Sequence, residues 1–78
     1  MIKIYGKEYC KSCEDAMTYC DVKGIPYEYL SLGKGFNISD MKEICATHKS
    51  FPMIVDVDFN DNVEYIGTLS HLKTWLPI

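Results

Sequence analysis

Alternating and helical apolar spacings divide the first thirty residues into a strand, a helix and a second strand. Ile2, Ile4 and Tyr5 predict a short strand that ends at Gly6. The apolar residues at positions 13, 16, 17 and 20 then follow the spacing of one helix face. Gly24 supplies a helix stop, and an aromatic segment over 27–30 predicts the next strand. We expect this strand–helix–strand unit to be parallel and right-handed.

The rest of the chain predicts a short helix, a hairpin and a last helix. Ser39 is a suitable N-cap for a helix whose buried face would carry Met41, Ile44 and Cys45. Two apolar runs around a polar turn at 60–62 predict an antiparallel hairpin with strands 53–57 and 63–66. Apolar residues at 69, 72, 75 and 76, followed by Pro77, predict the final helix. The order β-α-β-α-β-β-α indicates an α/β fold in one domain over residues 1–78.

Charge and hydropathy exclude two classes of partner. The net charge of −3 and the pI near 5.2 argue against nucleic acid, because phosphate binding needs a concentrated basic face. No stretch approaches the roughly 20 apolar residues of a membrane span, and the N-terminus lacks the apolar segment of a secretory signal. We therefore expect a cytoplasmic protein, in a reducing compartment, with no membrane or nucleic-acid partner.

Two cysteines, Cys10 and Cys13, stand directly behind the first strand. Two intervening residues at the first turn of a helix place both sulfurs on one face, within reach of a disulfide. The free N–H groups and the positive end of the helix dipole at this position favour a thiolate at Cys10. Lys7 and Lys11 act in the same direction, whereas acidic residues at 14 and 15 oppose it. The spacing therefore predicts a redox dithiol at a strand-to-helix turn.

The same spacing also occurs in structural zinc sites. Cys45 and His48 supply a second pair, so that Cys10, Cys13, Cys45 and His48 form an acceptable ligand set on spacing alone. Against this alternative, Cys45 falls in an apolar helical repeat, which favours a buried packing thiol. We expect the same packing role for Cys20, and no metal at the dithiol.

Three segments of the chain resemble landmarks of the glutaredoxin family, in particular the short glutaredoxins of bacteriophages and bacteria. Lys7-Glu-Tyr-Cys-Lys-Ser-Cys13 is similar to the family's Lys-x-x-Cys-x-x-Cys active-site segment. Ser50-Phe51-Pro52 stands where the family has Thr-Val-Pro with a cis proline, and Tyr65-Ile66-Gly67-Thr68 stands at its Gly-Gly turn. The resemblance covers essentially the whole chain. It implies a thioredoxin-like fold, with a four-stranded mixed sheet flanked by three helices.

The resemblance also implies a reaction and its residues. Cys10 would attack a disulfide, Cys13 or glutathione would resolve the mixed disulfide, and glutathione, as co-substrate, would restore the dithiol. Phe51 would bind glutathione through its main chain beside a cis Pro52, which the low cost of cis X-Pro bonds permits. Lys7, with His48 or Lys49 as weaker candidates, would meet the glycyl carboxylate. Leu69 and Ser70 would hold the glutamyl end.

Departures from the family pattern concern the glutathione groove. Lys11 and Ser12 stand in place of a stiffening proline and a groove-lining aromatic residue, and Thr68 stands in place of the second glycine. Ser70 replaces an acidic residue that receives the glutamyl ammonium, with His71 next to it, so weaker glutathione binding is expected. We consider His71 either a surface residue or a substitute ligand.

Further expectations concern partners. The family analogy implies a monomer with no tightly bound cofactor, protein disulfide clients such as ribonucleotide reductase, and, for a phage-encoded protein, the host cytoplasm. An alternative is a binding role, in which glutathione and Cys10 hold a bridging iron–sulfur cluster between two subunits. The resemblance permits it, because the proline that discourages clusters in the family is missing after Cys10.

Overall fold

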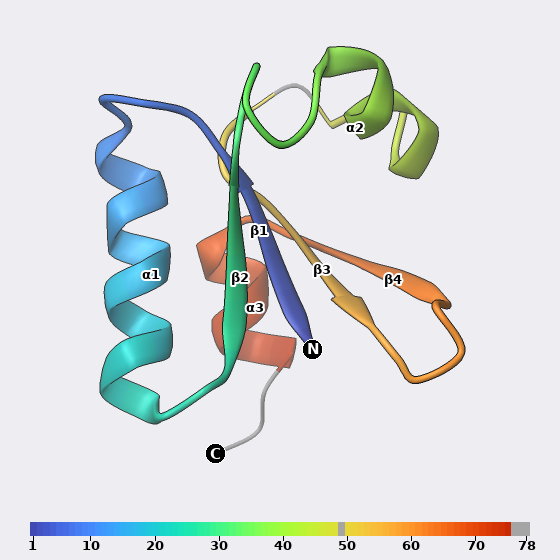
Figure 1. The fold of residues 1–78 in the computed structure, drawn as a ribbon. Coiled ribbons are helices and arrows are strands. Elements are labelled where there is room, and N and C mark those ends of the chain that lie inside the picture. The colour runs from blue at the N-terminus through green and yellow to red at the C-terminus, as the bar shows by residue number, and fades with distance from the viewer. Residues whose placement is uncertain (49, 76–78) are drawn as a thin grey trace.

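The fold is a mixed four-stranded sheet with helices on both faces. The computed structural model describes residues 1–48 and 50–75. The elements are β1 (Ile2–Gly6), α1 (Lys11–Lys23), β2 (Tyr27–Ser31), α2 (Ile38–Ile44), β3 (Met53–Val57), β4 (Val63–Gly67) and α3 (Leu69–Trp75), as Figure 1 shows. This is the predicted order; the last residue predicted for the final helix, Leu76, and the proline predicted to stop it, Pro77, lie outside the described residues. Within the described ranges, none of the helices has the length and hydrophobicity that a membrane crossing requires.

The strands lie in the order β2-β1-β3-β4. β1 and β2 are parallel, whereas β3 is antiparallel to both β1 and β4. The parallel unit and the hairpin that the sequence predicts are thereby confirmed. Because β1 is central, the segment that follows it, which carries both active-site candidates, leaves from the middle of the sheet.

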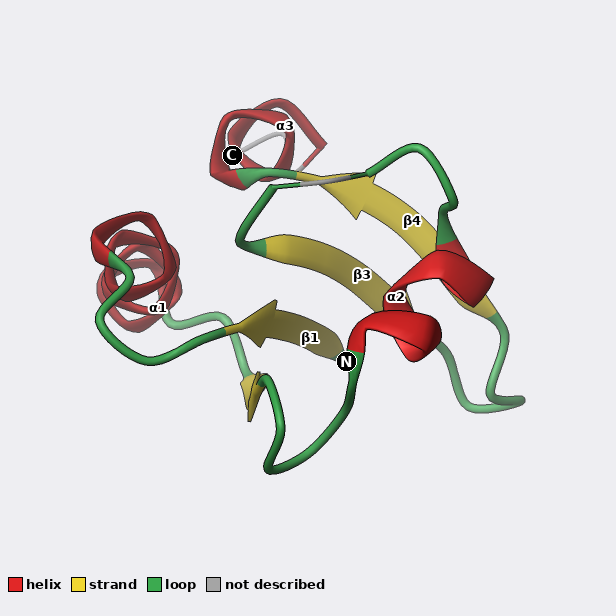
Figure 2. Ribbon diagram, turned by 90° about the horizontal axis from the view of Figure 1, so that it is seen from above, coloured by secondary structure: helices red, strands yellow, loops and turns green. Residues whose placement is uncertain are grey.

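Two apolar clusters fill the two faces of the sheet. On one face, α1 and α3 cover a core formed by Ile2, Ile4, Ala16, Cys20, Ile54, Ile66 and Leu72. On the other face, α2 lies over Phe36, Met41, Met53 and Val55. Figure 2 shows α1 and α3 on one side of the sheet and α2 on the opposite side. Neighbouring residues of β3 thus serve opposite faces, as the alternation of a strand requires.

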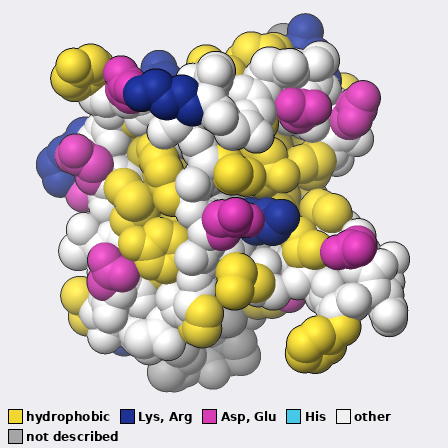
Figure 3. Space-filling view, viewed as in Figure 1, with side chains coloured by type: hydrophobic (Ala, Val, Ile, Leu, Met, Phe, Trp, Pro, Cys, Tyr) yellow, Lys and Arg dark blue, Asp and Glu magenta, His cyan; other side chains and the backbone are white. Residues whose placement is uncertain are grey.

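The face beneath α2 is only partly covered, because this helix has seven residues. Tyr5, Leu30 and Val57 belong to its cluster but stay half-buried. Apolar side chains accordingly reach the surface between β2 and α2 (Figure 3).

α1 and α2 begin and end at residues that satisfy their terminal backbone groups. Gly24 ends α1 in the left-handed conformation, with φ +69°, as the sequence predicts. The prediction that Ser39 caps α2 is wrong. Asn37 is the N-cap, and it forms a reciprocal capping box with Asp40. Ser39 lies inside the first turn, where its hydroxyl donates to Asn37 Oδ1.

The turn from β4 into α3 is organised by His71. Its Nδ1 accepts a hydrogen bond from the Thr68 backbone N–H at 3.1 Å and lies 3.0 Å from Thr68 Oγ1. His71 therefore reaches back to the residue before the helix, as the acidic residue of a capping box does. Gly67 makes this possible, because a Cβ on Gly67 would lie 2.6 Å from His71 Nδ1. His71 is an exposed residue with a capping role that the sequence did not indicate.

We predict that Gly67→Ala destabilises the protein more than Gly33→Ala. Both glycines have positive φ, +123° and +84°, but a Cβ at Gly33 meets nothing within 4 Å. Gly33→Ala, the control, should therefore lower the free energy of unfolding by only about 1 kcal/mol, the cost of a positive φ for alanine. Gly67→Ala should add about 1 kcal/mol for the displaced cap. Urea denaturation of both variants measures the difference.

The His71→Ala background supplies the control for this comparison. Without the imidazole, the difference between the two alanine variants should shrink. An equal difference in both backgrounds would show that His71 does not set the cost at Gly67.

Candidate active site

Cys10 and Cys13 lie at the start of α1, as predicted. Cys10 is the N-cap, in an extended conformation with φ −116°, and its Sγ accepts a hydrogen bond from the Cys13 backbone N–H at 3.3 Å. The sulfur thus takes the place of the capping oxygen of a serine or aspartate. Because α1 has thirteen residues, its N-terminal dipole also favours negative charge at this atom.

The two thiols differ sharply in exposure. Both are free thiols; Cys10 is half-buried, whereas Cys13 is 0 % exposed. Burial, and secondly the hydrogen bond with Cys10, raise the pKa of Cys13 from 9.0 to about 11. A disulfide partner from solution can therefore reach Cys10 but not Cys13, which stays protonated at neutral pH.

Tyr29, on β2, lies beneath the active-site segment. Its hydroxyl donates to the Lys7 carbonyl at 3.1 Å, and burial and the neighbouring Cys13 raise the pKa of Tyr29 to about 12. Gly6 leaves room for this side chain, because a Cβ on Gly6 would lie 2.3 Å from the Tyr29 hydroxyl. The sequence did not identify Tyr29 as a site residue. The only signal was Gly6, the last residue of β1.

The lysines expected to assist Cys10 have other partners. Lys11 Nζ forms an ion pair with Asp15 at 2.6 Å. Asp15 also raises the pKa of Lys11, by its hydrogen bond and then by its charge. Lys7 lies over the Phe51 ring, with Nζ 5.1 Å from the ring centroid. Lys7 therefore faces the segment before β3 from the start of the active-site loop.

The bond between Phe51 and Pro52 is cis, as predicted. A groove of about 250 Å³ lies beside it, between α1 and α3. The groove is lined by Ser12, Asp15, Phe51, Pro52, Thr68, Leu69 and Ser70. The structure thus brings together four of the predicted glutathione-binding residues, and Lys7 contacts one of them.

The segment between α2 and β3 holds a second group of polar side chains. His48 Nδ1 lies 2.5 Å from the Tyr65 hydroxyl, and its Nε2 is 3.4 Å from Ser50 Oγ. Cys45 is the C-cap of α2 and is half-buried, so the expectation of a core cysteine is wrong. A hydrogen bond with Thr47 lowers the pKa of Cys45. The sequence periodicity placed Cys45 on the buried face of the helix, but α2 ends one residue before it, at Ile44. Lys49 lies outside the described residues.

The zinc alternative finds no support in the described residues. In residues 1–48 and 50–75, no group of three or more His, Cys, Asp or Glu side chains is arranged to hold a metal ion. Cys10 and Cys13 lie at the start of α1, whereas Cys45 and His48 lie after α2. There, Cys45 forms a hydrogen bond with Thr47, and His48 forms one with Tyr65.

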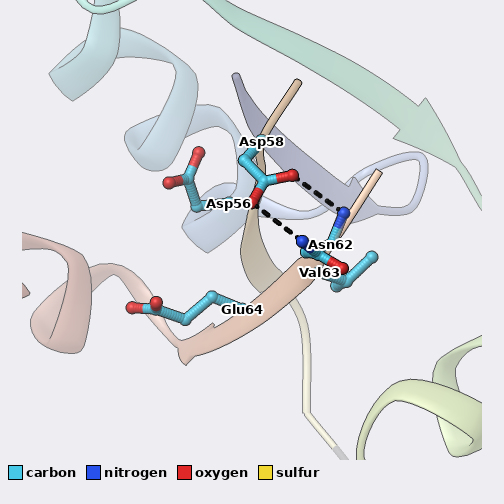
Figure 4. A pocket seen from close by; sticks show the side chains of 5 residues that line it. All are labelled: Asp56, Asp58, Asn62, Val63 and Glu64. Carbon is cyan, nitrogen blue, oxygen red and sulfur yellow. Dashed lines mark hydrogen bonds between the residues drawn. The ribbon is translucent and has the colours of Figure 1, made fainter. Parts of the chain in front are cut away.

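A separate hollow of about 270 Å³ lies at the β3–β4 hairpin, at the other end of β3 from Pro52. Figure 4 shows its acidic side chains, and each has a structural partner. Asp58 accepts the backbone N–H of Asn62 at 3.0 Å, drawn in Figure 4, and that of Asn60 at 2.8 Å, and these hydrogen bonds lower the pKa of Asp58. Asp56 pairs with the N-terminal ammonium, and Glu64 accepts the Trp75 indole N–H. Asp58 thus organises the turn.

The comparisons with known proteins agree with this architecture. Neither a protein-family model nor a curated protein matches the sequence. Among solved structures, glutaredoxin 1 from Francisella tularensis, crystallised with cacodylate, matches with a TM-score of 0.65 and 18% identity. The match covers 94% of this chain and 87% of that chain. The chain therefore has a thioredoxin-like fold. More specifically, the fold is glutaredoxin-like, as the sequence resemblance predicts.

We predict that folding protects Cys13 from alkylation. With a pKa of about 11 in place of 9.0, the thiolate fraction at pH 8 is smaller by a factor on the order of 100. Iodoacetamide should therefore label Cys13 about 100-fold more slowly in the folded protein than in urea. Peptide mapping by mass spectrometry at early times measures both rates.

Cys45 is the internal control for this experiment, because it is half-exposed and its pKa is lowered. Its labelling in the folded protein should stay within a few-fold of its labelling in urea. Equal protection of the two cysteines would contradict the assignment of Cys13 as the shielded thiol.

Proposed function

We propose that this chain is a glutathione-dependent thiol–disulfide oxidoreductase that reduces protein disulfides and glutathione mixed disulfides. The observation that carries the proposal is the asymmetry of its two thiols. Cys10 is accessible and accepts the Cys13 N–H at the start of α1, whereas Cys13 is fully buried behind it. One sulfur is thus suited to attack from outside and the other to resolve from within.

In the first step, the Cys10 thiolate attacks one sulfur of a client disulfide. A bond forms between Cys10 Sγ and that sulfur, the client S–S bond breaks, and its electron pair leaves with the other client sulfur. The leaving sulfur takes a proton from solvent. The Cys13 N–H and the dipole of α1 stabilise the attacking charge before the reaction.

In the second step, Cys13 loses its proton and attacks Cys10 Sγ. The second client sulfur leaves as a thiolate, so the client has gained two electrons and the protein holds a Cys10–Cys13 disulfide. The hydrogen bond and the charge of Cys10 both raise the pKa of Cys13 in the reduced protein. Both contributions end when Cys10 is in the mixed disulfide, which makes Cys13 easier to deprotonate at the moment it must react.

Glutathione completes the cycle in this proposal. Two molecules supply two electrons and leave as glutathione disulfide. The groove beside Phe51 and Pro52 supports a site for it, because Leu69 and Ser70 line it too and Lys7 contacts Phe51. We propose main-chain contacts at Phe51, a charge contact from Lys7 to the glycyl carboxylate, and the glutamyl end at Leu69 and Ser70.

The proposal extends to compartment and clients. A reducing compartment such as the cytoplasm follows from the proposed reaction, because glutathione can restore the dithiol only where thiols are kept reduced. Ribonucleotide reductase remains a predicted client by family analogy, and a monomer remains the predicted state.

We predict that Cys10→Ser abolishes glutathione-coupled reduction of a small mixed disulfide. Loss of at least 100-fold is expected, because no other accessible thiol occupies the start of α1. Cys13→Ser should retain turnover on glutathione mixed disulfides, where glutathione can resolve the intermediate, but should lose reduction of protein disulfides. Turnover that survives Cys10→Ser would contradict the proposal.

A further inference from the structure

Phe51 separates two grooves of different chemistry. The groove toward α1 and α3 is polar as well as apolar, with Ser12 and Asp15 in its wall. On the α2 side lies a second groove of about 170 Å³. It is lined by Ile38, Met41, Lys42, Ala46, His48 and Phe51. Its wall is therefore mainly apolar, and it shares Phe51 with the groove toward α1 and α3.

The volume of this second groove limits what it can hold. A cavity of about 150 Å³ accepts one benzene molecule. At about 170 Å³ the groove therefore has the size of one bulky apolar side chain. Ile38 is 44% exposed at its edge, so filling the groove would remove apolar surface from water.

Charge at the edge of the groove indicates the kind of segment that carries this side chain. Lys42 lines the groove, and Lys7 Nζ lies over the ring of Phe51, another lining residue. Among residues 1–48 and 50–75, neither lysine forms an ion pair, whereas Lys3, Lys11 and Lys34 each have an acidic partner. Two unpaired cations beside an apolar groove favour a partner with an acidic residue near its apolar one.

We infer that the groove between α2 and Phe51 selects protein clients that carry a bulky apolar side chain next to the disulfide, in an acidic context. The inference rests on the proposed function, because the mixed disulfide with Cys10 is what holds the client segment along Phe51. The groove then adds specificity for polypeptides over small disulfides.

Two disulfide-linked peptides test this directly. They differ only in the residue beside the cysteine, leucine or serine, and both carry an aspartate two residues away. The wild type should reduce the leucine peptide with a kcat/KM about tenfold above that for the serine peptide, as is common for one apolar side chain in a pocket. Reduction of a small glutathione mixed disulfide by the wild type is measured in parallel.

The variants Ile38→Ser and Ala46→Phe test the groove itself. The first removes an apolar wall and the second fills the space, so both should bring the leucine-to-serine ratio close to one. Val22→Ser is the matched control for the first, because Val22 is an exposed apolar residue of α1, 77% exposed, that lines neither groove. Its ratio should equal that of the wild type.

The outcomes separate this inference from the proposed function. A wild type that reduces the small mixed disulfide but treats both peptides alike overturns the groove assignment only. A ratio that stays at about ten in Ile38→Ser and Ala46→Phe also overturns it. Sedimentation that shows a dimer dissociating with Ile38→Ser would assign the groove to a second copy of the chain instead. No turnover on any substrate overturns both proposals.

Discussion

The site depends on placing one thiol at the open end of a helix and the other beneath it. The backbone N–H of the buried residue, Cys13, is donated to the sulfur of the accessible one, so a single turn of α1 sets both environments. The sheet supports this turn from below, where Tyr29 holds the Lys7 carbonyl. Gly6 is required for the same reason, since any side chain there would occupy the space of the Tyr29 hydroxyl. The reactivity of the pair thus follows from packing on β1 and β2 as much as from the motif.

Phe51 borders both grooves. Its cis bond to Pro52 stands at the start of β3, and β3 contributes neighbouring residues to the two opposite cores. The groove toward α1 and α3 therefore lies on one side of Phe51 and the groove toward α2 on the other. A client held at Cys10 would meet both, with different chemistry on each side. The thin cover provided by α2 leaves its groove open, because a helix of seven residues cannot bury the whole face.

Sequence patterns predicted what depends on local spacing and missed what depends on contacts between distant segments. The alternation in β1 and the helical spacing of α1 sufficed to predict these two elements, because burial imposes those periods directly. Ser39 and Asn37 are both good caps, and only the capping box with Asp40 decides between them. Cys45 was expected inside α2, and the earlier end of the helix moves it to the surface. Tyr29 and His71 act through residues on other elements or across a turn, which no single-residue preference reveals.

The redox equilibrium of Cys10 and Cys13 in glutathione buffers tests the central claim most directly. Mass spectrometry across a range of reduced and oxidised glutathione would follow the loss of two hydrogens and locate the disulfide. The account predicts one two-electron transition, a Cys10–Cys13 bond, and a potential of roughly −200 to −230 mV, the range of glutaredoxins. Oxidising buffers that leave both thiols free, or that pair Cys10 with Cys20 or Cys45 instead, would contradict it.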